Sequence, residues 1–221
     1  MMKKLFSPGC ALMLYKPELA DQICNMLIKM QTCSNMYTNC CHHKPITDKA
    51  LFIINTCPGC HRRYSSLYRN VKTISLWEIL AESDTFTFPD YKGAVMSIHD
   101  ACPTKNKPEV HNAIRKIISR MNISLKEPEK TKTSSVCCGD TYYKLKSDEE
   151  VTTAMIKRAE EMPAEDVIVY CVSCVKSIHT GGKKPRYLPD LLFGQETLTN
   201  NETTKKWHDR IENYIRTTGA L

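Results

Sequence analysis

The sequence has no long apolar run. None of its 221 residues lies in a stretch that approaches the ~18 consecutive apolar residues needed by a membrane-spanning helix. Its opening letters, MMKKLFSPGCALML, contain a short apolar stretch, but Ser7, Pro8 and Gly9 interrupt it. An export signal needs an uninterrupted apolar core of roughly 7–15 residues. We therefore expect a cytoplasmic protein without a membrane span.

Motifs for nucleotides and nucleic acids are also missing. No Gly-x-Gly-x-x-Gly fingerprint occurs, so any flavin that takes part must belong to another subunit. The formal net charge is +7, but lysine and arginine are spread along the chain without a recognisable nucleic-acid motif. A solvated basic surface, with no nucleic acid as partner, is the expectation.

Cysteine, in contrast, is abundant and ordered. Ten of the twelve cysteines form two copies of one pattern, which is a single Cys, then Cys-Cys, then Cys-x-x-Cys. The first cysteine set is Cys10, Cys40, Cys41, Cys57 and Cys60, and the second cysteine set is Cys102, Cys137, Cys138, Cys171 and Cys174. Disulfides are rare in a reducing cytoplasm, where dense cysteine indicates metal binding or redox catalysis. The pattern therefore predicts two related thiolate sites that serve metal binding or redox catalysis.

The repeat extends beyond the cysteines. Residues 5–12 match residues 97–104, each an apolar lead-in followed by a turn with one Cys. Residues 50–63 match residues 166–177, each an apolar strand that delivers a Cys-x-x-Cys at its carboxyl end. Strands that alternate with helices favour parallel sheets. We expect an α/β protein of two pseudo-symmetric βα halves with mostly parallel sheets, and cysteine sites at strand C-termini near the interface of the halves.

The expected elements follow from periodicity. Apolar residues at helical spacing predict helices, and continuous apolar runs predict strands buried on both faces. The expected helices are 17–31, 108–121, 148–162 and 203–216, the strands include 51–54 and 167–170, and 123–136 is expected to be a loop. We place the domain boundary after residue 88, with an N-terminal half 1–88 and a C-terminal half 89–221 that includes the terminal helix.

Each site has more thiolates than common metal centres use. A Cys-x-x-Cys between a strand and a helix places two sulfurs at the helix N-terminus, where free N–H groups and the helix dipole lower thiol pKa values. Structural zinc and cubane iron–sulfur clusters take four ligands. A fifth cysteine means either an idle member or an unusual cluster. The ferredoxin spacing C-x₂-C-x₂-C-x₃-C does not occur, so this is no ordinary ferredoxin.

Other cysteines and histidines carry weaker signals. Cys24 lies on the apolar face of a predicted helix and is expected in the core. His42 and His43 follow the first Cys-Cys pair and are expected in a solvent-facing loop, although His42 would be a ligand candidate if that site held zinc. His61 and His99 lie next to site residues and offer only a weak case for contact with a cluster.

The spacing resembles the cysteine-rich CCG family, named for its Cys-Cys-Gly motif. In the second half, 34 residues separate Cys102 from the Cys137-Cys138-Gly139 motif, and 32 residues separate Cys138 from Cys171. A glycine at this place either forms a plain turn or lets the backbone pass close to a cluster. The first half departs from the family pattern. It reads Cys-Cys-His at residues 40–42, and only 15 residues separate Cys41 from Cys57.

The resemblance implies a function. In the B subunit of heterodisulfide reductase, a member of this family, each set of five cysteines holds a noncubane 4Fe–4S cluster, and a disulfide is split between the two clusters. It implies that all ten cysteines of the two sets are cluster ligands. The expected partners are a ferredoxin-like or flavoprotein electron-transfer subunit and a small thiol or disulfide substrate. Catalytic residues other than the ligands are not assigned.

Two other functions stay open. The chain could relay electrons for a flavin dehydrogenase complex, or it could be a zinc-stabilised binding module without redox chemistry. Because the first half departs from the family pattern, its site could hold the same cluster, another cluster, zinc, or nothing.

Overall fold

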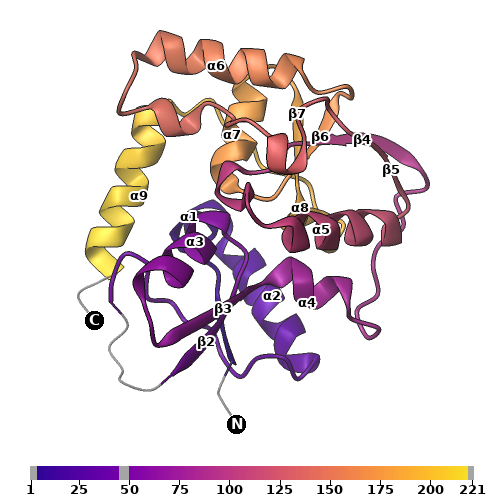
Figure 1. The fold of residues 1–221 in the computed structure, drawn as a ribbon, viewed down its shortest axis with the longest axis vertical. Coiled ribbons are helices and arrows are strands. Elements are labelled where there is room, and N and C mark those ends of the chain that lie inside the picture. The colour runs from indigo at the N-terminus through magenta and orange to yellow at the C-terminus, as the bar shows by residue number, and fades with distance from the viewer. Residues whose placement is uncertain (1–3, 45–49, 219–221) are drawn as a thin grey trace. The chain divides into compact units, whose positions relative to one another are not determined.

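The computed structural model describes residues 4–44 and 50–218. Contacts divide the chain into two compact units, which we call unit 1 (residues 1–86 and 208–221) and unit 2 (residues 87–207). Each unit contains its own parallel β-sheet with helices around it, as Figure 1 shows. The expected α/β fold of two βα halves is confirmed.

Unit 1 contains a three-stranded parallel sheet in the order β1-β2-β3. Its strands are β1 (Lys4–Ser7), β2 (Leu51–Asn55) and β3 (Val71–Ser75). Its helices are α1 (Cys10–Tyr15), α2 (Pro17–Lys29), α3 (Pro58–Leu67) and α4 (Leu76–Ala81). Because the strands are parallel and adjacent, the loops that leave β1 and β2 meet at one edge of the sheet.

The core of unit 1 follows the apolar pattern of its sequence. Leu19, Ile23 and Leu27 occupy one face of α2 and are 0% exposed. Burying a side chain of this size contributes about 1.5–3 kcal/mol to folding. Cys24 lies on the same helix and is 5% exposed, as expected for a small core residue.

Unit 2 contains a four-stranded parallel sheet in the order β5-β4-β6-β7. Its strands are β4 (Ala94–Ile98), β5 (Ile123–Lys126), β6 (Asp166–Val169) and β7 (Lys184–Tyr187). Its helices are α5 (Pro108–Arg120), α6 (Asp148–Glu160), α7 (Val172–Thr180) and α8 (Leu188–Leu192), with 3₁₀ turns at Cys102–Thr104, Lys132–Ser134 and Asp140–Tyr142. A further helix, α9 (Thr204–Thr218), begins in unit 2.

The strand order of unit 2 predicts where a ligand binds. The chain adds β5 to one side of β4 and then β6 to the other side, so the winding direction reverses between β4 and β6. In Figure 1, α5 lies on one side of this sheet and α6 and α7 lie on the other. In open α/β sheets, ligands bind beyond the strand carboxyl ends at such a reversal. The residues that follow β4 and β6 are therefore the first candidates for a site.

One expectation about secondary structure was wrong. The polar stretch 123–136 was expected to be a loop, but its first four residues form β5, which pairs in parallel with β4. Ile123 is buried, whereas Lys126 is exposed. A short edge strand with one covered face needs few apolar residues, which explains why composition missed it.

Most of the terminal helix belongs to a different unit from the one expected. Residues 208–221, which include most of α9, belong to unit 1, whereas the sequence placed the whole helix with residues 89–221. The reason is tertiary packing against unit 1. Ile215 packs against the buried cysteine cluster of unit 1, and the Arg210 guanidinium donates a hydrogen bond to the Leu14 carbonyl (3.3 Å).

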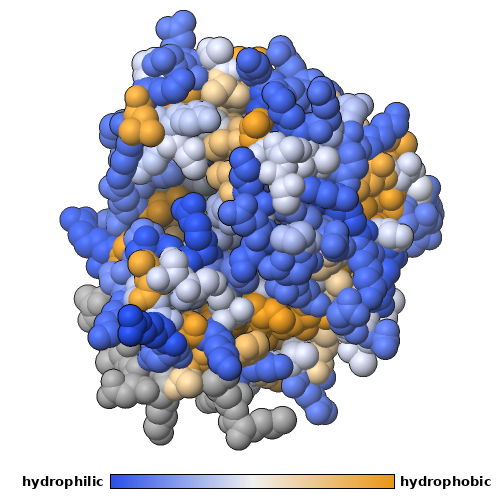
Figure 2. All heavy atoms as spheres, viewed as in Figure 1, coloured by the Kyte–Doolittle hydropathy of each residue, from blue (hydrophilic) through white to orange (hydrophobic). Residues whose placement is uncertain are grey.

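Hydrophilic side chains cover most of the face drawn in Figure 2. Within the described residues, every helix is too short or too polar to span a bilayer.

Candidate metal centres

Three residues of the first cysteine set lie where β1 and β2 end. Cys10 begins α1, three residues after the end of β1, while Cys57 is the N-cap of α3, two residues after the end of β2. Cys60 lies in the first turn of α3. The strand–Cys-x-x-Cys–helix arrangement expected from the sequence is present, so these sulfurs share one edge of the sheet.

The Cys-Cys pair of unit 1 completes the set. Cys40 and Cys41 are each 3% exposed, and they form a buried cluster with Cys60 against which Cys10 and Cys57 pack. Tyr68 fixes the loop, because its hydroxyl donates a hydrogen bond to the Cys41 carbonyl (2.9 Å). The structure thus brings the whole first set together, even though its Cys-Cys-His sequence departs from the family pattern.

Gly9 has a structural role beside this set. Its φ angle is +80°, and a Cβ at this position would lie 3.0 Å from Cys60 Sγ and 3.2 Å from Cys57 Cβ. Any other residue would press on the Cys-x-x-Cys. The turn before Cys10 therefore needs glycine both for its backbone conformation and for the space beside the sulfurs.

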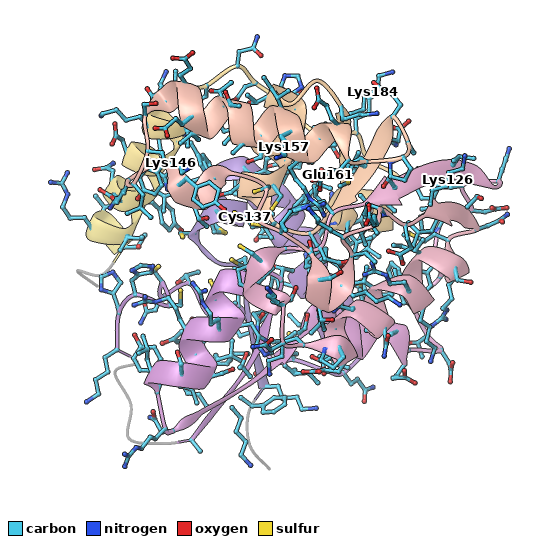
Figure 3. The ribbon with its side chains drawn as sticks, turned by 45° about the horizontal axis from the view of Figure 1, so that its top comes forward. Lys126, Cys137, Lys146, Lys157, Glu161 and Lys184 are labelled. Atoms are coloured by element: carbon cyan, nitrogen blue, oxygen red, sulfur yellow. The ribbon has the colours of Figure 1, made fainter. Side chains whose placement is uncertain are left out.

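The second cysteine set has the same plan in unit 2. Cys102 begins a 3₁₀ turn after β4, Cys171 is the N-cap of α7 after β6, and Cys174 follows in the first turn of α7. Cys102 Sγ lies 4.0 Å from Cys137 Sγ, and Cys174 Sγ lies 3.5 Å from Cys138 Sγ. The set gathers where the winding of the sheet reverses. Figure 3 labels Cys137 on the loop that precedes α6.

Hydrogen bonds between thiols make one member of each Cys-Cys pair acidic. The Cys10 thiol donates to Cys40 and lowers the pKa of Cys40 to about 2. The Cys102 thiol donates to Cys137 in the same way and lowers the pKa of Cys137 far below its usual value. Because the thiolate is the form that binds metals, each set presents a ready ligand at neutral pH.

Gly139 follows the second Cys-Cys pair in a left-handed conformation, with φ at +103°. A Cβ there would lie 2.9 Å from Met155 Cγ and 3.0 Å from the Met155 backbone nitrogen on α6. The sequence left open a plain turn or a close approach of the backbone to a cluster, and in the structure the close neighbour is helix α6. The glycine lets the Cys137-Cys138 loop lie directly on that helix.

A buried carboxylate connects the segments that carry the second set. Asp100, 1% exposed, accepts two hydrogen bonds from Arg115 (2.6 and 2.7 Å) and one from the Lys132 backbone N–H (2.7 Å). Tyr170 donates a further bond to it (3.1 Å), and the Ser135 hydroxyl donates to the Asp100 carbonyl (2.8 Å). The turn before Cys102 is thus tied to the segment before Cys137. Sequence reasoning missed this network, because its members are far apart in the chain.

His99 lies beside the sulfurs of the second set. Its ring is 0% exposed, and a ring nitrogen, Cys138 Sγ and Cys174 Sγ all lie within 4.8 Å of one another. Nδ1 accepts a hydrogen bond from Arg158 Nε (3.1 Å). Burial, aided by the charge of Arg158, lowers the pKa of His99 to about 4. Sequence reasoning made only a weak case for His99, although its position between β4 and Cys102 was a usable signal.

The other histidines near the cysteines have partners of their own. His42 is exposed, as expected for a loop residue. His43 Nε2 lies 2.7 Å from the Ile215 carbonyl and donates to it, and His61 Nδ1 lies 3.3 Å from the Asn55 side-chain amide. Within residues 4–44 and 50–218, His99 is the histidine that groups with cysteine sulfurs in the geometry of a metal site.

The donor sets fit a metal–sulfur centre. Soft thiolates select zinc, copper(I) and iron–sulfur clusters over hard cations. Each set unites five sulfurs from three separate segments at the carboxyl edge of a parallel sheet, and Gly9 leaves space beside the first set. The clustered cysteines thus indicate metal binding. Which of the ten cysteines are ligands stays a prediction.

Fold and site together define a cysteine-rich α/β domain whose clustered thiols fit a metal centre. The family model described as CCG, a cysteine-rich domain, matches residues 96–179, which include the whole second set. This segment of unit 2 is thus similar to the CCG cysteine-rich domain. The first set lies outside the matched residues. No curated protein matches the chain.

Proposed function

We propose that this protein is an iron–sulfur oxidoreductase of the heterodisulfide-reductase B-subunit type, which reduces a disulfide or a related thiol substrate. The observation that supports this most is the gathering of five thiols in each unit at strand carboxyl ends, in a chain with a CCG domain. Iron–sulfur oxidoreduction is the chemistry generally linked to that family.

Each cysteine set would hold one noncubane 4Fe–4S cluster. The ligands are Cys10, Cys40, Cys41, Cys57 and Cys60 at the first site, and Cys102, Cys137, Cys138, Cys171 and Cys174 at the second. Such clusters supply electrons one at a time when bound. Zinc at the first site is the variant of this proposal that the altered first motif favours.

The second set offers a side that a substrate can approach. Cys138 and Cys174 are buried, whereas Cys102, Cys137 and Cys171 are partly exposed. The buried sulfurs anchor the site against the core, and the partly exposed ones border solvent. A small disulfide could therefore reach this sulfur cluster from the solvent side.

The reaction needs an external electron donor. Reducing one disulfide consumes two electrons and two protons, breaks the S–S bond and releases two thiols. The sequence has neither a flavin fingerprint nor a ferredoxin spacing, so a ferredoxin-like or flavoprotein partner is proposed to deliver the electrons singly.

A viologen assay tests the proposal. The anaerobically purified chain, reconstituted with iron and sulfide, is mixed with reduced viologen and a panel of small disulfides, and viologen oxidation and thiol release are followed. Two viologens oxidised per disulfide, lost in the Cys138→Ala variant and kept in the Cys24→Ala variant, is the expected result. Reducible clusters without any turnover would instead support an electron relay, and a colourless zinc protein would support a binding module.

A further inference from the structure

His99 has one satisfied and one free ring nitrogen. Nδ1 lies 3.1 Å from Arg158 Nε, while Nε2 is buried and has no hydrogen-bond partner among the described residues. Buried polar atoms nearly always have a partner, so each exception calls for an explanation. The sulfurs of Cys138 and Cys174 group with this ring within 4.8 Å.

Arg158 determines which nitrogen carries the proton. A guanidinium has only donors, so Nδ1 must accept and cannot bear a hydrogen. The neutral ring then carries its hydrogen on Nε2. Arg158 is itself fixed, because Nη1 donates to the Glu161 carboxylate (2.5 Å) and Nη2 donates to the Lys130 carbonyl (2.9 Å). Glu161 is labelled in Figure 3, near the end of α6.

This tautomer gives His99 a different role from that of a metal ligand. A nitrogen that ligates must present a lone pair, whereas Nε2 presents an N–H group. Hydrogen bonds to the sulfurs are among the features that set the reduction potential of an iron–sulfur cluster, and a donor favours the more negative, reduced state. We propose that His99 is a positioning residue that donates an Nε2–H hydrogen bond to the sulfur of the second site and raises the reduction potential there.

The two units differ at this position. In the alignment of residues 5–12 with residues 97–104, Ser7 stands where His99 stands. The Ser7 hydroxyl lies 3.3 Å from the Tyr64 hydroxyl. At this aligned position the first site therefore has a serine hydroxyl where the second site has an imidazole.

The inference rests on the proposed iron–sulfur function, and a redox titration followed by electron paramagnetic resonance tests it in the reconstituted full chain. In His99→Phe, we expect unchanged iron per chain and a lower potential at the second site. The expected change is about tenfold in the reduction equilibrium constant, which is about 59 mV for a one-electron couple. His99→Gln, which keeps an N–H at a similar reach, should restore part of the shift.

The matched control is His111→Leu. His111 is also 0% exposed in unit 2, and its Nδ1 also has no hydrogen-bond partner among the described residues. Its Nε2 lies 3.2 Å from the Thr104 hydroxyl, and its ring does not group with cysteine sulfurs in the described part of the chain. The potential of this variant should equal that of the wild type. Iron loss in His99→Phe, or a strong nitrogen hyperfine coupling in the wild type that this substitution removes, would make His99 a ligand and overturn the inference. An unchanged potential in His99→Phe would overturn it too.

Failure of the proposed function is a separate outcome. If the chain takes up zinc alone, the iron–sulfur assignment fails, and ¹⁵N chemical shifts of the diamagnetic zinc protein then test the histidine directly. A protonated Nε2 with an unprotonated Nδ1 supports the donor role. A zinc-bound Nε2 contradicts it.

Discussion

Arg115 and Asp100 form a buried, bidentate ion pair, with two N–H···O hydrogen bonds of 2.6 and 2.7 Å. Asp100 lies two residues before Cys102, and its other partners include the Lys132 backbone and the Tyr170 hydroxyl. The pair therefore connects helix α5, the turn after β4 and the segment that leads to Cys137. The second site depends on this connection for its geometry.

Asp100→Asn should destabilise unit 2. The substitution removes one of two carboxylates that pair with the partly buried Arg115 and leaves Glu127 as the other. Removing one partner of a buried pair costs up to about 3–5 kcal/mol. Denaturant unfolding of the full chain measures the loss. Lys107→Met is the control, because Lys107 pairs with Glu109 in an exposed ion pair (3.5 Å) that should contribute little. Equal stabilities of the two variants would contradict the account.

Glu127 should make stability depend on pH. Burial would raise its pKa, but hydrogen bonds from Arg115 and Thr131 outweigh burial and lower the pKa below its ordinary value. A lowered folded-state pKa adds stability above the unfolded-state pKa of roughly 4.3 and loses it as the pH falls through the folded-state value. Unfolding at pH 6 and at about pH 3, which lies below the unfolded-state pKa, should show the wild type losing more stability than Glu127→Gln. Equal losses of unfolding free energy in the wild type and in Glu127→Gln would contradict this contribution of Glu127.

Gly139→Ala should damage the second site. The new Cβ would need a left-handed φ and would lie 2.9 Å from Met155 Cγ and 3.0 Å from the Met155 backbone nitrogen. Strained backbone of this kind costs on the order of 1–3 kcal/mol. The Cys137-Cys138 loop should shift, and metal content should fall.

Gly93→Ala separates the clash from the backbone strain. Gly93 also has a left-handed φ of +77°, but nothing lies within 4 Å of its would-be Cβ. This variant should lose some stability and keep its metal. If both variants retained the metal, the packing of Gly139 on α6 would not matter for the site.

The effect of a cysteine substitution on metal content should depend on whether the cysteine belongs to one of the two sets. Cys138→Ala removes a buried sulfur that lies 3.5 Å from Cys174 Sγ, and it should lose or convert the metal centre of unit 2. Cys24→Ala changes a core residue of α2 outside both sets and should leave metal content intact. Iron, zinc and visible absorption per chain measure both effects. A large metal loss in Cys24→Ala would contradict the assignment of that residue to the core.

Local signals predicted much of the fold. The apolar runs that became β2 and β6 are strong, and the helical spacing of Leu19, Ile23 and Leu27 defines α2. Strand β5 was missed, because an edge strand needs little apolar surface. The membership of α9 was also missed, because the packing of Ile215 in unit 1 is a tertiary contact that no local pattern records.

The site was predictable where it depends on adjacent residues. The Cys-x-x-Cys motifs after strands placed Cys57 and Cys171 at helix N-termini, as the structure shows. The side chains that surround the cysteines could not be predicted. His99 and Arg158 are 59 positions apart, and only the folded sheet brings them together. That both sites lie near the interface of the halves stays a prediction.

The most direct test of the account is the content of iron, zinc and acid-labile sulfide per chain after strictly anaerobic purification. The account predicts about eight irons with matching sulfide, the expectation for two four-iron clusters, or about four irons with one zinc if the first site holds zinc. Zinc alone, unchanged after reconstitution with iron and sulfide, would contradict it.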